Sequence, residues 1–112
     1  MSGALWPAPK VAYAKAPSIV SEIGWIARTA RAVAHGPDDV TSQREFWLRK
    51  AALLDRIALD DEAGGRHTDA CELALNAARF LIGLDGAAGP GPDDPRGYVR
   101  RAYARYTHTE SE

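Results

Sequence analysis

Cysteine is nearly absent from this sequence of 112 residues, because Cys71 is the single one. An internal disulfide is therefore excluded, which suits a reducing compartment, and we expect a cytoplasmic protein. The sequence also lacks a run of about 18 uncharged apolar residues, and its start, MSGALWPAPK, shows no basic segment followed by an apolar one. The sequence therefore predicts neither a membrane-spanning helix nor secretion, and we expect no membrane partner.

An excess of charge of one sign is missing as well. Lysine and arginine contribute 14 residues and the acidic residues 15, for a formal net charge of −1. This balance argues against a protein that coats nucleic acid with its whole surface, so any basic site must be local. Hydrophobic residues make up 46% of the chain and charged residues 26%, which is typical of a soluble globular domain with a real core.

β-branched residues are sparse and never alternate with polar residues over the length of a strand, whereas alanine is the most frequent residue. The sequence therefore predicts an all-α fold with a small three-helix core, a short fourth C-terminal helix and an extended N-terminal arm. The segments that we expect are an arm (residues 1–17), the core (18–86), a Gly/Pro spacer (87–95), the C-terminal helix (96–106) and a polar tail (107–112).

The predicted arm is rich in proline, with Pro7, Pro9 and Pro17. Each proline removes an amide donor and biases the preceding residue toward extended geometry. Trp6 and Tyr13 are large aromatic residues that gain by burial, so we expect them to pin part of the arm against the core or a partner. The alternative is a frayed terminus.

The first helix of the core is expected from Ile19 to Ala34. Ser18 is a suitable N-cap, and the His-Gly-Pro sequence that follows Ala34 is a stop signal. Apolar residues recur in steps of four and three along the helix, and we expect this stripe to face the core. Its members are Ile19, Ile23, Ile26, Ala30 and Val33.

The second helix is expected to begin at a capping box formed by Ser42 and Glu45, ahead of the apolar run that starts at Phe46. We expect this helix to end near Leu59, since residues 60–65, DDEAGG, resemble a polar turn.

The third helix is expected from Thr68 to Leu84 and is apolar on most of its circumference. A helix with so few polar positions is either central in the fold or covered by an oligomer partner. The predicted core joins apolar residues of the second and third helices, namely Phe46, Leu53, Leu54 and Ile57 with Leu73, Phe80 and Leu81.

No catalytic or metal-binding pattern is present. His67 and Cys71 share a helix face at i, i+4, but a structural zinc site needs four ligands and a cysteine nucleophile needs an oriented base. The glycines of residues 86–91 are interrupted by proline and are followed by no Lys-Ser/Thr pair, so they do not form a phosphate-binding loop. We therefore expect no enzyme activity, no cofactor and no metal. A small enzyme with an unpatterned site remains a third alternative.

Residues 96–106, RGYVRRAYARY, combine three tyrosines with four arginines and contain no acidic residue. Asp94 and Pro95 precede them as a suitable N-cap and first helical residue. One face of the predicted helix is apolar and suited to docking on other helices, with Val99, Ala102, Tyr103 and Tyr106. The arginines lie around the rest of the helix.

Three interpretations of this basic, tyrosine-rich helix stay open. Arginine beside tyrosine suits phosphate contact and base stacking, and the same pair is enriched in protein interfaces. The helix can also simply close the bundle, with its arginines paired to Asp60, Asp61 and Glu62. The Gly/Pro spacer makes the helix separable, so we expect residues 18–86 to fold without it.

The sequence thus predicts a non-catalytic interaction or regulatory module that binds another protein or a second copy of itself. The alternative function is a nucleic-acid-binding accessory protein that uses the same helix. The candidate partner-binding residues are Trp6, Tyr98, Arg100, Arg101, Tyr103, Arg105 and Tyr106.

Overall fold

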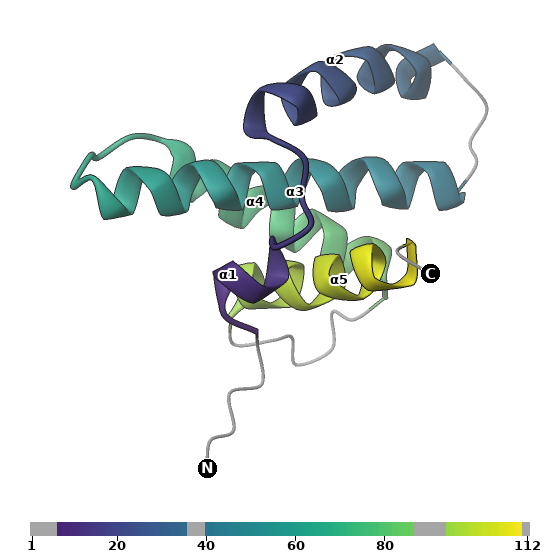
Figure 1. Ribbon diagram of the computed structural model, residues 1–112. Coiled ribbons are helices and arrows are strands. Elements are labelled where there is room, and N and C mark those ends of the chain that lie inside the picture. Colours follow the sequence, from purple (N-terminus) through teal and green to yellow (C-terminus); the bar gives the residue numbers. More distant parts are fainter. Residues whose placement is uncertain (1–6, 36–39, 87–93, 111–112) are drawn as a thin grey trace.

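The computed structural model describes residues 7–35, 40–86 and 94–110, and in these residues it contains helices and no strand. This confirms the predicted all-α fold. Trp6 and most of the predicted spacer lie outside the described residues. The helices are α1 (Pro9–Ala12), α2 (Ile19–His35), α3 (Val40–Ala63), α4 (Ala70–Leu84) and α5 (Pro95–Glu110) (Figure 1).

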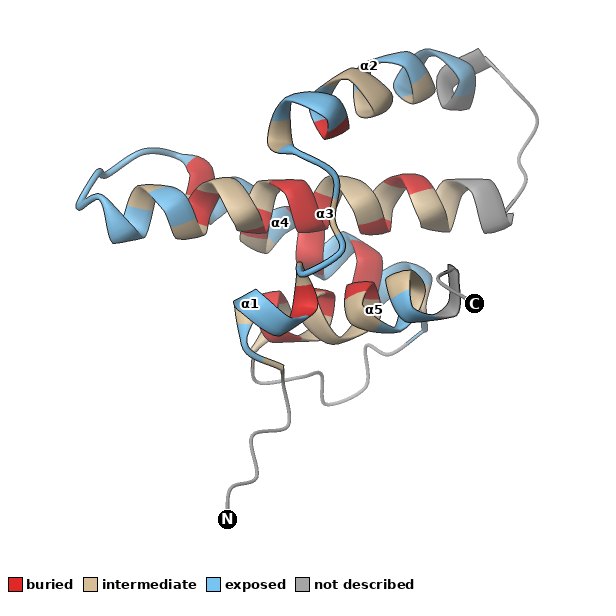
Figure 2. Cartoon of the chain, in the orientation of Figure 1, coloured by how far each residue is buried: buried red, intermediate tan, exposed pale blue. Residues whose placement is uncertain are grey.

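The long helix α3 organises the molecule. In Figure 1, α2 lies on one side of α3, whereas α5 lies on the other and α4 runs behind. Helices α3, α4 and α5 contact one another, while α2 contacts only α3 among the described helices. The main cluster of buried side chains therefore comes from α3, α4 and α5, whose facing sides are buried in Figure 2. Its members are Leu48, Ala51, Ala52, Ala77, Ala78, Leu81, Val99 and Tyr103.

The described side chains of the predicted apolar stripe of α2 are not buried in the core, and the side chain of Val33 lies outside the described part of the structure. The side chain of Ile23 is 48% exposed, Ala30 is exposed, and Ile19 and Ile26 are only half-buried. Against α3, helix α2 instead buries a charged side chain, that of Glu22, which is 2% exposed and pairs with Arg49. The start of the helix is as predicted, since the amide of Ser21 donates to Oγ of Ser18 at 3.1 Å.

Helix α3 is longer than predicted at both ends. It begins at Val40, so Ser42 lies inside its first turn and is not the N-cap. It continues through the predicted turn to Ala63 and ends where Gly65 takes a φ of 72°. Glycine adopts this left-handed conformation without a steric penalty, so the end of the helix is set by Gly65 and not by the acidic residues before it.

Helix α4 begins at Ala70, slightly later than predicted, and ends at Leu84 as predicted. Thr68 lies outside the helix, and its Oγ1 accepts a hydrogen bond from the amide of Ala70 at 3.1 Å. At the other end, Gly86 has a φ of 70°, and its amide donates to the carbonyl of Gly83 at 3.1 Å. A positive φ at a glycine just past the last turn is a common helix stop.

Helix α5 starts as predicted, because Oδ1 of Asp94 accepts a hydrogen bond from the amide of Gly97 at 3.1 Å. It extends to Glu110, beyond the predicted end at Tyr106.

The described part of the predicted arm is not fully extended, because Pro9–Ala12 form one helical turn that packs on α5. Proline is tolerated in the first helical turn, where its missing amide hydrogen has no intrahelical acceptor. Ala12 is buried and Tyr13 is half-buried, with its ring centroid 5.5 Å from that of Tyr103. Tyr13 therefore pins this segment to the core, as predicted.

The predicted core was partly wrong. Phe46, Leu53 and Leu81 are buried as expected, whereas Leu73 and Phe80 are about half exposed. The buried face of α4 carries alanines, including Ala74, Ala77 and Ala78, because α3 and α5 approach it closely on that side.

Candidate functional site

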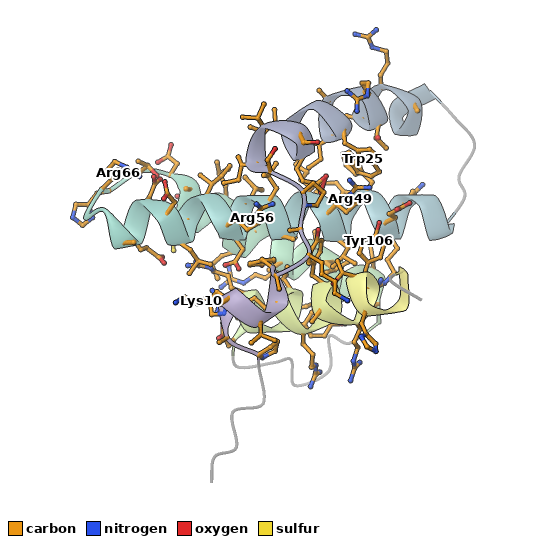
Figure 3. The ribbon with its side chains drawn as sticks, viewed as in Figure 1. Lys10, Trp25, Arg49, Arg56, Arg66 and Tyr106 are labelled. Atoms are coloured by element: carbon orange, nitrogen blue, oxygen red, sulfur yellow. The ribbon has the colours of Figure 1, made fainter. Side chains whose placement is uncertain are left out.

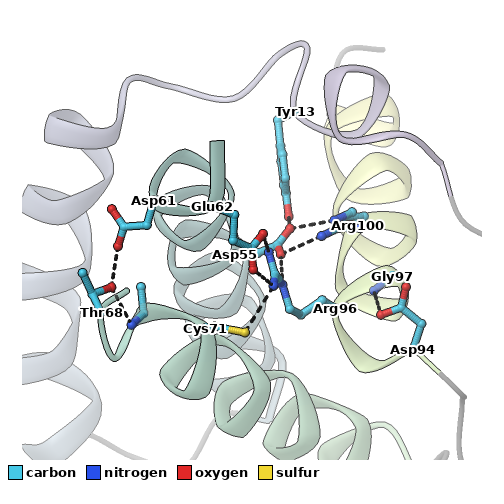
Figure 4. Close-up of polar contacts among 11 residues, drawn as sticks. Tyr13, Asp55, Asp61, Glu62, Thr68, Cys71, Asp94, Arg96, Gly97 and Arg100 are labelled. Carbon is cyan, nitrogen blue, oxygen red and sulfur yellow. Dashed lines mark hydrogen bonds and ion pairs between the residues drawn. The ribbon is translucent and has the colours of Figure 1, made fainter. Parts of the chain in front are cut away.

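A buried cluster of ion pairs surrounds Asp55, near the middle of α3 (Figure 4). Asp55 is 1% exposed, and its carboxylate accepts hydrogen bonds from three side chains. Arg96 donates from Nε at 2.5 Å, and Arg100 donates from Nε at 2.8 Å and from Nη2 at 3.0 Å. The hydroxyl of Tyr13 donates at 2.6 Å. One carboxylate therefore ties α3 to α5 and to the segment after α1.

Arg96 extends this cluster to the end of α3. Its Nη1 donates to Glu62 at 2.8 Å and lies 3.6 Å from Sγ of Cys71. Burial alone would lower the pKa of Arg96, but its hydrogen bonds to Glu62 and Asp55 outweigh this effect and raise it. The hydrogen bond from Arg96 in turn holds the pKa of Glu62 below its ordinary value. The cluster contains two arginines and two carboxylates, so its formal charges balance.

These contacts place much of the RGYVRRAYARY segment inside the protein. Arg100 pairs with Asp55, and Tyr103 is 2% exposed within the main core. Each of these two side chains is engaged within the chain, and their predicted role in binding a partner stays a prediction. Of the predicted acidic partners of α5, Glu62 pairs with Arg96 of that helix, whereas Asp60 and Asp61 pair with Arg66.

Asp55 is the central residue of the cluster, although no sequence motif singles it out. The sequence contains one indication that Asp55 is buried. Asp55 lies four residues after Ala51 and three residues before Ala58, and both alanines are in the buried face of α3. A carboxylate on an apolar helix face needs a charged partner. The sequence alone does not show that α5 supplies it.

The other two tyrosines of α5 also bind carboxylates of neighbouring helices. Tyr98 donates to Asp85 at 2.6 Å, and Arg44 of α3 donates to the same carboxylate at 2.7 Å. Burial and the nearby carboxylate raise the pKa of Tyr98 to about 12. Tyr106 donates to Glu45 of α3 at 2.6 Å. Both hydroxyl groups therefore hold α5 in place.

Arg101 and Arg105 lie away from the Asp55 cluster. Arg101 is half-buried near Tyr98, and Arg105 is exposed. Arg105 contributes to a groove of about 360 Å³ between α5 and the segment around α1. Of the predicted partner-binding residues that the structure describes, Arg105 is the one classed as exposed.

A row of aromatic rings runs from α2 across α3 to α4, formed by Trp25, Phe46, Trp47 and Phe80. The ring centroids are 6.5 Å apart for Trp25 and Phe46, 5.5 Å for Phe46 and Trp47, and 4.3 Å for Trp47 and Phe80. The guanidinium of Arg49 lies 3.6 Å from the centroid of Trp25, between α2 and α3 (Figure 3), and also pairs with Glu22. This aromatic row ends at the surface, because Phe80 is half exposed.

The exposed face of α4 continues from the end of the aromatic row. Leu73 is 50% exposed, Phe80 is 48% exposed and Leu84 is 40% exposed. Gly83 lies between Phe80 and Leu84, and a side-chain carbon built on it would meet no atom within 4 Å. We call Leu73, Phe80, Gly83 and Leu84 the α4 stripe. It is an open apolar strip along one helix.

No metal site is found among the described residues, in which no group of three or more potential ligands is arranged to hold an ion. His67 is exposed and Cys71 is half-buried beside Arg96. Across residues 7–35, 40–86 and 94–110, no helix combines the length and apolar character needed to cross a membrane.

Comparison with known proteins gives no relative from which to transfer a function, since no family model, curated protein or solved structure shows significant similarity to this chain.

Proposed function

We propose that this protein is a small helical interaction module that binds a helix of another protein molecule through the α4 stripe. The observation that carries the proposal is the half exposure of Leu73, Phe80 and Leu84, which recur in steps of seven and four along α4. This spacing places them on one face of the helix, as in helices that pack against a partner helix. A contiguous exposed apolar patch is a feature of interaction surfaces.

The position of the α4 stripe favours binding. The adjacent face of α4 is buried, with Ala78 and Leu81 in the main cluster and Ala74 in a second one, so the backbone that presents the stripe is anchored. A partner therefore meets a surface that needs little ordering, which lowers the entropic cost of association. The ring of Phe80 also packs on Trp47, which limits the conformations of this side chain.

Nucleic-acid binding is less well supported. Of the four arginines of residues 96–106, Arg96 and Arg100 already pair with the buried carboxylate of Asp55. A phosphate contact by either residue would take one of its two arginine partners from the buried Asp55, which is costly. Because these two arginines are already paired, the local basic site on which the nucleic-acid-binding alternative depends is weaker.

A photo-cross-linking experiment on the full chain in its native cell tests the proposal. A benzophenone amino acid at position 80 should cross-link to a protein, whereas the same group at Val20, an exposed apolar residue of α2, should not. Adding Leu73→Ser and Leu84→Ser to the position 80 probe should abolish the adduct, because both changes remove apolar area from the interface.

Circular dichroism must show that the substituted chains keep their helical content. An adduct from position 20 that matches the one from position 80 would contradict the proposal, as would the absence of any protein adduct at position 80. Adducts to nucleic acid, removed by nuclease, would favour the alternative function.

A further inference from the structure

We propose that the partner of the α4 stripe is a second copy of this chain, bound antiparallel across a two-fold axis so that the two α4 helices pack against each other. The inference rests on the proposed function, since it names the occupant of the same surface. The structure contributes two observations, the distribution of charge beside the stripe and the small and polar residues within it.

The charged residues beside the α4 stripe have opposite signs at its two ends. Glu72 precedes Leu73, and Arg79 precedes Phe80, so both lie on the same edge of the stripe, seven residues apart. Both residues are exposed, and neither is in an ion pair with another described residue.

An antiparallel neighbour complements this pattern with its own sequence. Turning one α4 helix around so that Leu73 faces Phe80 of its copy brings Glu72 of each chain toward Arg79 of the other. A two-fold axis makes every contact twice, so two such pairs form. In a parallel pair related by a two-fold axis, the edge that carries Glu72 and Arg79 would instead lie opposite the other edge of the copy, so these two residues would not meet.

The middle of the stripe also suits a copy of itself. Asn76 lies between Leu73 and Phe80 on the same exposed face, and an amide can both donate to and accept from the same group of a second chain. A polar residue at the centre of an apolar helix interface selects one register over others. Gly83, with open space beside it, leaves room for a large side chain of the neighbouring helix.

Sedimentation equilibrium of the purified full chain tests the inference. The mass should approach twice the 12.1 kDa of one chain as the concentration rises. Phe80→Ser should weaken the dimer at least roughly tenfold, because an aromatic residue at the centre of an interface contributes about 2 kcal/mol or more. Val20→Ser, on the exposed face of α2, should leave the dimerisation constant unchanged.

Charge reversal tests the antiparallel arrangement. Glu72→Arg and Arg79→Glu should each weaken the dimer about fivefold or more, because each replaces two attractive contacts by two repulsive ones. The double variant should recover most of the affinity, since the pairs form again with their signs exchanged. Circular dichroism on each variant separates these effects from misfolding. A double variant no tighter than the singles would overturn the antiparallel assignment.

The outcomes separate this inference from the proposed function. A full chain that stays monomeric at every concentration overturns the second copy as occupant, while a protein adduct from position 80 would still support an interaction module with a different partner. A dimer that is insensitive to Phe80→Ser overturns the inference as well, because its interface then lies elsewhere.

Discussion

At the scale of single residues, the most consequential group is Asp55, a buried carboxylate that binds two arginines and a tyrosine. Burying a charge costs free energy unless its partners are well placed, so such a cluster adds little net stability compared with apolar packing. Removing one partner is different, because it leaves a charge buried without compensation. The cluster therefore constrains which arrangement of α3 and α5 the chain adopts.

We predict that Asp55→Ala lowers the free energy of unfolding by about 3–5 kcal/mol, since Arg100 would lose its carboxylate while remaining largely buried. Asp60→Ala is the matched control, because Asp60 pairs with Arg66 at the surface, where an ion pair contributes about 1 kcal/mol or less. Urea unfolding followed by circular dichroism measures both. Equal effects of the two substitutions would show that the Asp55 cluster is not buried as described.

At the scale of helices, Asp85 connects three elements. It follows the last residue of α4, and its carboxylate accepts hydrogen bonds from Arg44 of α3 and from Tyr98 of α5. A second link joins α2 to α3, through Glu22 and Arg49. The helices of this small protein are thus joined by carboxylates at their contacts as well as by apolar side chains.

The contacts of Asp85 predict an effect of pH on stability. Burial alone would raise the pKa of Asp85, but the hydrogen bonds from Arg44 and Tyr98 outweigh it and hold the pKa below its ordinary value. A carboxylate whose pKa is lower in the folded state contributes stability above its unfolded pKa, about pH 4, and this stability is lost as the pH falls through the folded pKa. Asp85→Asn should therefore reduce the acid sensitivity of folding below about pH 4.

Urea unfolding at a series of pH values from neutral to acid measures this effect. Asp60→Asn, in an exposed pair, provides the control and should leave the pH dependence close to that of the unmodified chain. If the free energy of unfolding of Asp85→Asn and of the unmodified chain changed with pH in the same way, Asp85 would not be held by Arg44 and Tyr98.

At the scale of the whole molecule, α5 contributes to the main core. Val99 and Tyr103 lie in the main buried cluster, and Arg96 and Arg100 neutralise Asp55. The expectation that residues 18–86 fold alone assumed that the first three long helices form a complete core. The structure instead builds its core from α3, α4 and α5, with α2 packed only on α3.

We therefore predict that a chain truncated after Asp85 loses cooperative unfolding and much of its helical circular dichroism signal. The truncation exposes the apolar faces of α3 and α4 and leaves Asp55 without its arginines. A chain that ends after His108 is the control and should stay folded, since it keeps every residue of α5 in the main cluster. Cooperative unfolding of the shorter chain with undiminished helical signal per residue would contradict this prediction.

The sequence by itself determined the fold class and several helix boundaries, because these depend on local chemistry. Ser18 and Asp94 cap their helices through hydrogen bonds to amides three residues away, and Gly86 ends α4 through its own backbone. The sequence did not indicate that α3 continues through the acidic residues near its end, because these residues are compatible with a helix as well as with a turn. The residue that ends the helix is Gly65.

Only the tertiary structure decided which faces are buried. In the sequence, the apolar stripe of α2 and the α4 stripe are hydrophobic patterns like those of the helix faces that form the core. Which of them is covered depends on where α5 packs, and the position of α5 depends on Asp55, Asp85 and Glu45 meeting side chains that lie 13–61 residues away along the chain. Such pairings are not encoded in helical periodicity, which reports neighbours within a few turns of the same helix.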